Sequence, residues 1–159
     1  MTTKIEKHIE AARLIEVRDP EMENTIHRRP GFEEMVDLGE MDNRLGEALS
    51  RVRKKRGLTR PELAPLLGLT TQVYGRYERG EAKMHVTRLV HLSELLDFAP
   101  WDLIYAAAPH LWGDSQEEAE LRFQLMKHVE QLPPEKARLL MDLIRSFLEL
   151  EKVQPNRDA

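Results

Sequence analysis

Cysteine is absent from the 159 residues of this chain. Disulfide bonds, thiolate zinc sites and thiol redox switches are therefore excluded, and the composition suits a reducing cytoplasm. Aromatic residues make up only 6% of the chain, and no apolar run approaches the roughly 18 residues of a membrane-spanning helix. The N-terminus lacks the apolar segment of a signal peptide, so we expect a cytoplasmic protein with no membrane segment.

Motifs of catalysis and of metal binding are also missing. The histidines are scattered along the chain, and none stands in an HExxH or similar ligand spacing. Glycine-rich phosphate loops, nucleophile elbows and paired-carboxylate signatures are absent as well. We therefore expect no enzymatic activity, no metal site and no cofactor.

Charge is distributed unevenly along the chain. The net charge is −4, but residues 41–112 carry eleven basic and eight acidic groups, whereas the segments before and after them are acidic. The run RVRKKRGLTR (51–60) holds six basic residues and no acidic one. Such a run is typical of a helix face exposed to solvent, and it is also typical of a basic surface that binds nucleic acid.

The first forty residues predict one helix and an irregular arm. Apolar residues at helical spacing indicate an amphipathic helix near the N-terminus, with a stripe formed by Ile5, Ile9, Ala12 and Ile15. The following residues, up to about position 40, contain Pro20, the Pro30–Gly31 pair and many charges. They predict a linker or a loosely packed arm.

The central segment predicts a succession of short helices. Asp42 or Asn43 is expected to cap the first, which ends at Gly57 and has Leu45, Ala48, Leu49 and Val52 facing inward. Thr59 and Glu62 have the spacing of a capping box for the second, whose expected inward residues are Leu63, Leu66 and Leu67.

Gly68 permits the left-handed backbone that a sharp turn between two helices requires. Thr70 then caps a third helix that ends at Gly80. We expect Val73 or Tyr74, together with Tyr77, on its inner side. The expected outward residues are Thr71, Gln72, Gly75, Arg76 and Arg79.

Further helices are predicted towards the C-terminus. The fourth has an apolar stripe of Val86, Leu89, Val90 and Leu96, and the fifth begins at Pro100 and ends before Pro109. Two longer helices follow, separated by a turn at Pro133–Pro134. The last six residues, QPNRDA, are expected to be frayed.

The pattern around Gly68 resembles the phage-repressor and Cro-type helix-turn-helix of the XRE family of regulators. The resemblance covers roughly residues 44–107 and has no gap through GLTRPELAPLLGLTTQVYGRYERG (57–80). The residues that carry it are Arg53, Gly57, Leu58, Glu62, Leu63, Ala64, Gly68, Glu78 and Gly80. A generic helical bundle is the alternative reading.

The resemblance and the helices predicted on either side of it together give an all-α fold with four segments. A five-helix, lambda-repressor-like helix-turn-helix domain spans 41–112, preceded by an N-terminal helix and charged arm at 1–40. A C-terminal helical hairpin follows at 113–153, and a disordered tail at 154–159. The resemblance also implies an ion pair between Arg53 and Glu78.

The resemblance implies double-stranded DNA as a partner, with the third helix in the major groove. The residues implied to contact bases are Thr71, Gln72, Val73 and Arg76. Contacts to the DNA backbone are implied for Arg53, Lys54, Lys55, Arg56, Thr59, Arg60, Tyr74, Arg79 and Lys83. Three residues depart from the family pattern. Pro65 lies within a helix, and Gly75 weakens the recognition helix. The hydroxyl of Tyr74 needs water or a phosphate as a hydrogen-bond partner.

The C-terminal hairpin is expected to form a homodimer through Leu140, Leu143, Ile144, Phe147 and Leu148, because its apolar surface is wider than one packing stripe. Packing of the hairpin on its own DNA-binding domain is the alternative.

The chain is expected to function as a dimeric, sequence-specific transcriptional regulator, more in keeping with a repressor than an activator. One alternative is an antitoxin-like protein that sequesters a toxin through its flanking segments, with the N-terminal arm as a protein-binding segment. Another is a protein-interaction domain that has lost DNA binding.

Overall fold

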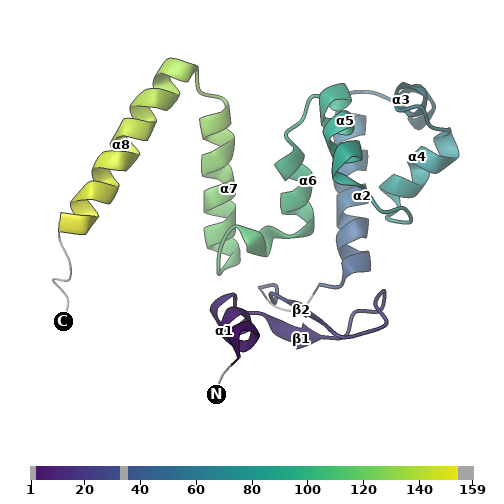
Figure 1. Cartoon of the computed structure of the whole chain (residues 1–159). Helices are drawn as coiled ribbons and strands as arrows, with labels where there is room; N and C mark the ends of the chain where they lie inside the picture. Colours follow the sequence, from purple (N-terminus) through teal and green to yellow (C-terminus); the bar gives the residue numbers. More distant parts are fainter. Residues whose placement is uncertain (1–2, 33–35, 154–159) are drawn as a thin grey trace. The chain divides into compact units, whose positions relative to one another are not determined.

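The computed structural model describes residues 3–32 and 36–153 of the chain (Figure 1). The chain consists of two compact units, 1–120 and 121–159. The tail expected at 154–159 lies outside the described residues. The described residues are mostly helical, as expected, and include one pair of short strands.

The arm preceding the central domain contains a helix and a β-hairpin. Helix α1 spans Lys4–Ala11, and strands β1 (Ile15–Val17) and β2 (Ile26–Arg28) pair antiparallel, with Ile15 opposite Arg28. The expectation of a helical stripe reaching Ile15 was wrong, because the backbone turns at Arg13, where φ is +52°. Strand β1 thus lies in the segment expected to be helical, and β2 lies in the residues expected to form a linker or a loosely packed arm.

Helix α2 (Leu38–Lys55) begins five to six residues earlier than expected. Asp37, rather than Asp42 or Asn43, caps it, since its carboxylate accepts a hydrogen bond from the Glu40 amide at 2.7 Å. Asp19 from the arm accepts a second bond from the Leu38 amide at 2.9 Å. The arm thus supplies part of the cap and lies at the N-terminal end of α2 (Figure 1).

Helices α3 (Arg60–Leu66) and α4 (Thr71–Glu78) form the helix-turn-helix. Gly68 has φ of +68° between them, and the Leu69 amide donates to the Ala64 carbonyl at 3.0 Å. Glu62 accepts hydrogen bonds from both the amide and the hydroxyl of Thr59, each at 2.7 Å. A local hydrogen bond therefore fixes the turn, and a capping box fixes the start of α3.

Helices α5 (Val86–Leu96) and α6 (Pro100–Ala107) complete the domain, and a short 3-10 turn, η1 (Pro109–Leu111), follows. The largest wholly buried side chains at the centre of the domain are Tyr74, Leu49, Leu63, Leu92, Leu96 and Leu103.

Some residues expected in the core are exposed. Leu66 is 58% exposed, because the buried side of the short helix α3 consists of Leu63 and Ala64. Val86 and Val90 are 75% and 44% exposed, because α5 presents Leu89, Leu92 and Leu96 to the core instead.

The C-terminal helices are α7 (Gln116–Glu130) and α8 (Pro134–Val153). The turn between them contains Pro133, as expected. No side chain described in α8 is buried, and most of the large apolar residues along it are exposed. None of the helices in the described parts of the chain is long and apolar enough to cross a membrane.

Candidate nucleic-acid interface

The outer face of α4 presents a contiguous set of exposed side chains. Thr71, Gln72, Val73 and Arg76 are all exposed, including 39% of Val73. Thr70 caps the helix by accepting a hydrogen bond from the Val73 amide at 3.3 Å. The residues expected to contact bases therefore lie together on one surface of a capped helix.

The inner face of α4 is anchored by Tyr74, which is 0% exposed. The expectation that its hydroxyl meets a phosphate was wrong, because this side chain lies in the core. Gly75 is also buried, and not outward as expected. A Cβ at Gly75 would lie 3.0 Å from Nη1 of Arg79, whose guanidinium covers it.

Helices α2 and α4 approach each other closely at Gly46. A Cβ at this position would lie 2.5 Å from the Tyr77 carbonyl oxygen and 2.6 Å from that of Glu78. Only a residue without a side chain fits that space. Sequence reasoning missed Gly46, although a glycine inside an amphipathic helix is a signal of a close approach.

The structure contains an ion pair between Arg53 and Glu78. Arg53 donates to both carboxylate oxygens of Glu78, from Nε at 2.5 Å and from Nη2 at 3.0 Å, and its Nη1 donates to the Leu58 carbonyl at 2.6 Å. The exposed fractions of the two side chains are 7% and 0%. Arg53 was also expected to contact the DNA backbone, which was wrong because its guanidinium is buried and bonded within the domain.

Arg60 is a second arginine partner of Glu78. Its Nε donates to Oε2 of Glu78 at 2.7 Å, while 40% of its side chain remains exposed. Burial by itself would raise the pKa of Glu78, but the hydrogen bonds from Arg53 and Arg60 outweigh it and lower the pKa to about 2. Burial and the neighbouring Glu78 raise the pKa of Tyr74 above its ordinary value. Glu78 is therefore a carboxylate at neutral pH and holds Arg60 at the start of α3.

Three other cations expected at the DNA backbone are held by partners within the chain. Arg56 donates to the Leu96 carbonyl at 2.6 Å and to Oδ2 of Asp97 at 2.9 Å. Arg79 forms a two-bond pair with Glu81 at 2.7 and 2.8 Å. Lys83 contacts Glu21 of the arm and also Asp42, whose carboxylate lies 2.5 Å away.

These three side chains are about half exposed, so binding a phosphate would require exchanging one anionic partner for another. Lys54 and Lys55 differ from them. Both are exposed at the end of α2, and neither pairs with an acidic residue in the described parts of the chain. Thr59 is exposed as well.

Within residues 3–32 and 36–153, no group of three or more histidine, aspartate or glutamate side chains is arranged to hold a metal ion. The chemistry that this surface offers is hydrogen bonding and charge, from an exposed helix face flanked by cations.

Among known protein families, a family model described as helix-turn-helix matches residues 49–102. Over 90 residues the chain is 31% identical to an HTH-type transcriptional regulatory protein of Pyrococcus furiosus, covering 55% of this chain and 29% of that protein. Over 51 residues it is 39% identical to an SPbeta prophage-derived HTH-type transcriptional regulator of Bacillus subtilis, covering 32% of this chain and 47% of that protein. The chain thus spans less than half the length of either relative.

Two solved structures also match. One is the restriction-modification controller protein C.AhdI from Aeromonas hydrophila, with 31% identity and a TM-score of 0.37, covering 38% of this chain and 92% of that one. The other is the DNA-binding domain of BldD, with 27% identity and a TM-score of 0.38, covering 41% of this chain and 94% of that one.

Proposed function

We propose that this chain, whose residues 49–102 form a helix-turn-helix domain of the phage-repressor and Cro type, is a sequence-specific transcriptional regulator. It binds a two-fold symmetric operator as a homodimer, with α4 in the major groove, and acts as a repressor by occupying the site. The observation that carries this proposal is the exposed outer face of α4 on a helix whose inner face is locked into the core.

The side chains on that face have the chemistry of base recognition. Gln72 bridges N6 and N7 of adenine, and Arg76 bridges O6 and N7 of guanine. Val73 contributes an apolar contact to a thymine methyl group, and Thr71 offers a hydroxyl to either kind of base. Each good two-bond pairing gives about 1–3 kcal/mol of discrimination against the wrong base.

Contacts to the phosphates are assigned to the exposed groups at the end of α2 and the start of α3. These groups are Lys54, Lys55, Thr59 and the exposed part of Arg60, which Glu78 orients through its hydrogen bond. Such contacts fix the register of the protein on the duplex and carry no sequence information of their own.

Dimerisation is assigned to α8, because one helix-turn-helix domain covers only a half-site. Ile144, Phe147 and Leu148 are 40%, 65% and 53% exposed. An exposed apolar surface of this width is typical of an interface, and a second copy would bury it together with Leu140 and Leu143.

The test is selection of bound duplexes from a random library by the purified full chain at physiological salt. We expect enrichment of a symmetric motif whose half-sites are about one helical turn apart. Arg76→Ala should lose the preference for one base pair in each half-site. Arg51→Ala, which removes the same charge from an exposed position of α2, should retain the motif. Absence of any enriched motif would contradict the proposal.

A further inference from the structure

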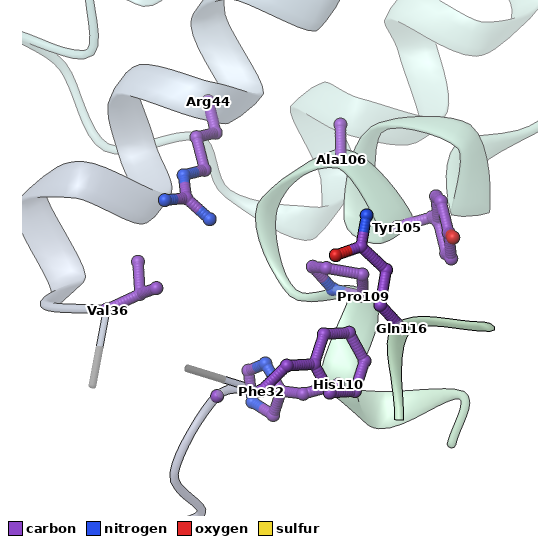
Figure 2. Close-up of a pocket in the computed structure, with 9 residues that line it drawn as sticks. Phe32, Val36, Arg44, Tyr105, Ala106, Pro109, His110 and Gln116 are labelled. Atoms are coloured by element: carbon purple, nitrogen blue, oxygen red, sulfur yellow. The ribbon is translucent and has the colours of Figure 1, made fainter. Parts of the chain in front are cut away.

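A cavity of 330 Å³ lies between the N-terminal arm and the helix-turn-helix domain (Figure 2). Phe32 and Val36 line it from the arm, Arg44 from α2 and Tyr105 from α6. His110 and Gln116 line it from the segment that follows α6. No residue of α3 or α4 is among its lining residues, so the cavity is separate from the proposed DNA-binding face.

Two polar groups point into this cavity with unused hydrogen-bonding capacity. Figure 2 shows the Arg44 guanidinium and the Gln116 amide directed towards the same space. Nε of Arg44 donates to Oε1 of Glu40 at 2.9 Å, and the guanidinium makes no other hydrogen bond within the described parts of the chain. The remaining donors of Arg44 have the planar fork geometry that matches a carboxylate.

A further cation, Arg29, lies beside the same space. Arg29 lines an adjoining cavity that shares Gly31, Phe32 and His110 with the first one, and no acidic side chain pairs with Arg29 among the described residues. Burial, together with the charges of Arg28 and Arg29, lowers the pKa of His110. Arg13 and Asp114 also line the adjoining cavity and pair with each other at 2.8 Å, and Glu40 pairs with Arg44. The positive charge that remains without an acidic partner is that of Arg29, and it favours an anion over a cation.

The rest of the lining is apolar and limits the size of a ligand. Phe32, Val36 and Tyr105 present rings and methyl groups, and the volume lies at the lower end of the range for small-molecule sites. A ligand with an apolar body would pack against these side chains while its charged end met Arg44.

We propose that this cavity binds a small organic carboxylate with an aromatic or aliphatic body. The carboxylate accepts a pair of hydrogen bonds from Arg44 and one from the amide of Gln116, and the body lies against Phe32, Val36 and Tyr105. The ligand contacts the arm and the helices of the domain together, so its binding stabilises the docked arm. This proposal does not rest on the function proposed above.

The experiment titrates the full chain, labelled with ¹⁵N, with three carboxylates, namely benzoate, phenylacetate and hexanoate. Amide chemical shifts report binding, and benzamide serves as the neutral counterpart of benzoate. We expect at least one carboxylate to bind saturably at millimolar concentrations and to shift the amides of Tyr105, Ala106 and His110. Benzamide should bind at least about tenfold more weakly than benzoate if benzoate is that ligand.

Arg44→Gln and Arg51→Gln form a matched pair of variants on α2. Each arginine pairs with a glutamate one turn earlier, Arg44 with Glu40 and Arg51 with Glu47, and both pairs are on the surface. Arg44→Gln should weaken carboxylate binding about tenfold or more, and Arg51→Gln should leave it unchanged. Amide spectra of both variants without ligand check that they remain folded.

Several outcomes would overturn the proposal. Failure of all three carboxylates to bind, or equal binding to the wild type and the Arg44→Gln variant, would show that Arg44 holds no carboxylate. Inorganic phosphate that shifts the same amides as strongly as the organic acids would show that the apolar lining contributes nothing.

Discussion

Glu78 connects the two helices of the helix-turn-helix to the helix before them. It lies at the end of α4, and it accepts hydrogen bonds from Arg53 of α2 and Arg60 of α3. Because its side chain is 0% exposed, removal of either charge would leave the other buried in a medium of low polarity. The orientation of α4 therefore depends on the ionisation of one carboxylate.

Stability should depend on pH through Glu78. The pKa of Glu78 is about 2 in the folded chain, against an ordinary value of 4.5. The unfolded chain therefore takes up a proton at higher pH than the folded chain does. The stabilisation is complete above about pH 5 and is lost as pH falls from there towards 2, by an amount on the order of 3 kcal/mol.

Glu78→Gln tests this dependence. We expect the free energy of unfolding at neutral pH, measured by urea denaturation, to fall by about 3 kcal/mol or more. The difference from the wild type should narrow as the pH approaches 2. Glu47→Gln removes an exposed partner of Arg51 and should cost less than about 1 kcal/mol. Equal effects of the two substitutions would contradict the role assigned to Glu78.

At the scale of elements, the crossing of α2 and α4 depends on the absence of a side chain at Gly46. Two main-chain carbonyl oxygens of α4 occupy the space that a Cβ would take. Main-chain atoms move only if the whole helix moves. A larger residue at this position would therefore displace the recognition helix as well as destabilise the core.

Gly46→Ala should lower the free energy of unfolding by about 1–3 kcal/mol, as overpacking in a core does. Gly39→Ala is the matched control on the same helix, because a Cβ there would meet the flexible Glu21 side chain at 3.4 Å. That control should be neutral or stabilising by up to about 1 kcal/mol, since alanine favours helix more than glycine does. Thermal or urea unfolding of both variants provides the measurement, and a stable Gly46→Ala variant would refute the close crossing.

The elements of the arm illustrate the limits of periodicity. Ile5, Ile9, Ala12 and Ile15 have helical spacing, yet Ile15 lies in β1 opposite Arg28. Such a pairing joins residues that are distant in sequence and leaves little signal in either short strand. Asp19 fixes the hairpin to the domain, because its buried carboxylate accepts hydrogen bonds from the amides of Glu21 and Leu38.

At the scale of the whole molecule, the proposed dimer places its interface on α8. Charged residues lie along one side of this helix, at Arg138, Asp142, Arg145 and Glu149. Apolar residues, most of them exposed, cover much of the remaining helix surface. Contact with a second copy would bury the apolar surface and leave the charged side in water.

Ile144→Asp combined with Phe147→Asp should therefore yield a folded monomer, with the mass measured by light scattering and the fold by circular dichroism. Arg138→Asp combined with Arg145→Asp introduces the same two carboxylates on the charged side of α8 and should remain a dimer. A dimer mass for the first variant would refute an interface on α8.

The helix-turn-helix could be read from the sequence because its signals are local. Thr59 and Thr70 stand at helix starts, Gly68 stands at the turn, and buried residues recur at helical spacing. Each signal depends on neighbours a few residues away, and the comparisons confirm the family to which the pattern pointed. The resemblance to that family implied the ion pair of Arg53 and Glu78.

Only the tertiary structure decided which of the candidate residues remain available to a ligand. Arg53, Tyr74 and Lys83 are residue types expected on a DNA-binding surface. Arg53 and Tyr74 are nevertheless buried, and Lys83 is paired with Glu21 from the arm. The space at Gly46 and the cavity at Arg44 likewise arise where distant segments meet. A sequence specifies local geometry through nearby hydrogen bonds and spacing, whereas the exposure and charge of a site depend on contacts between segments far apart along the chain.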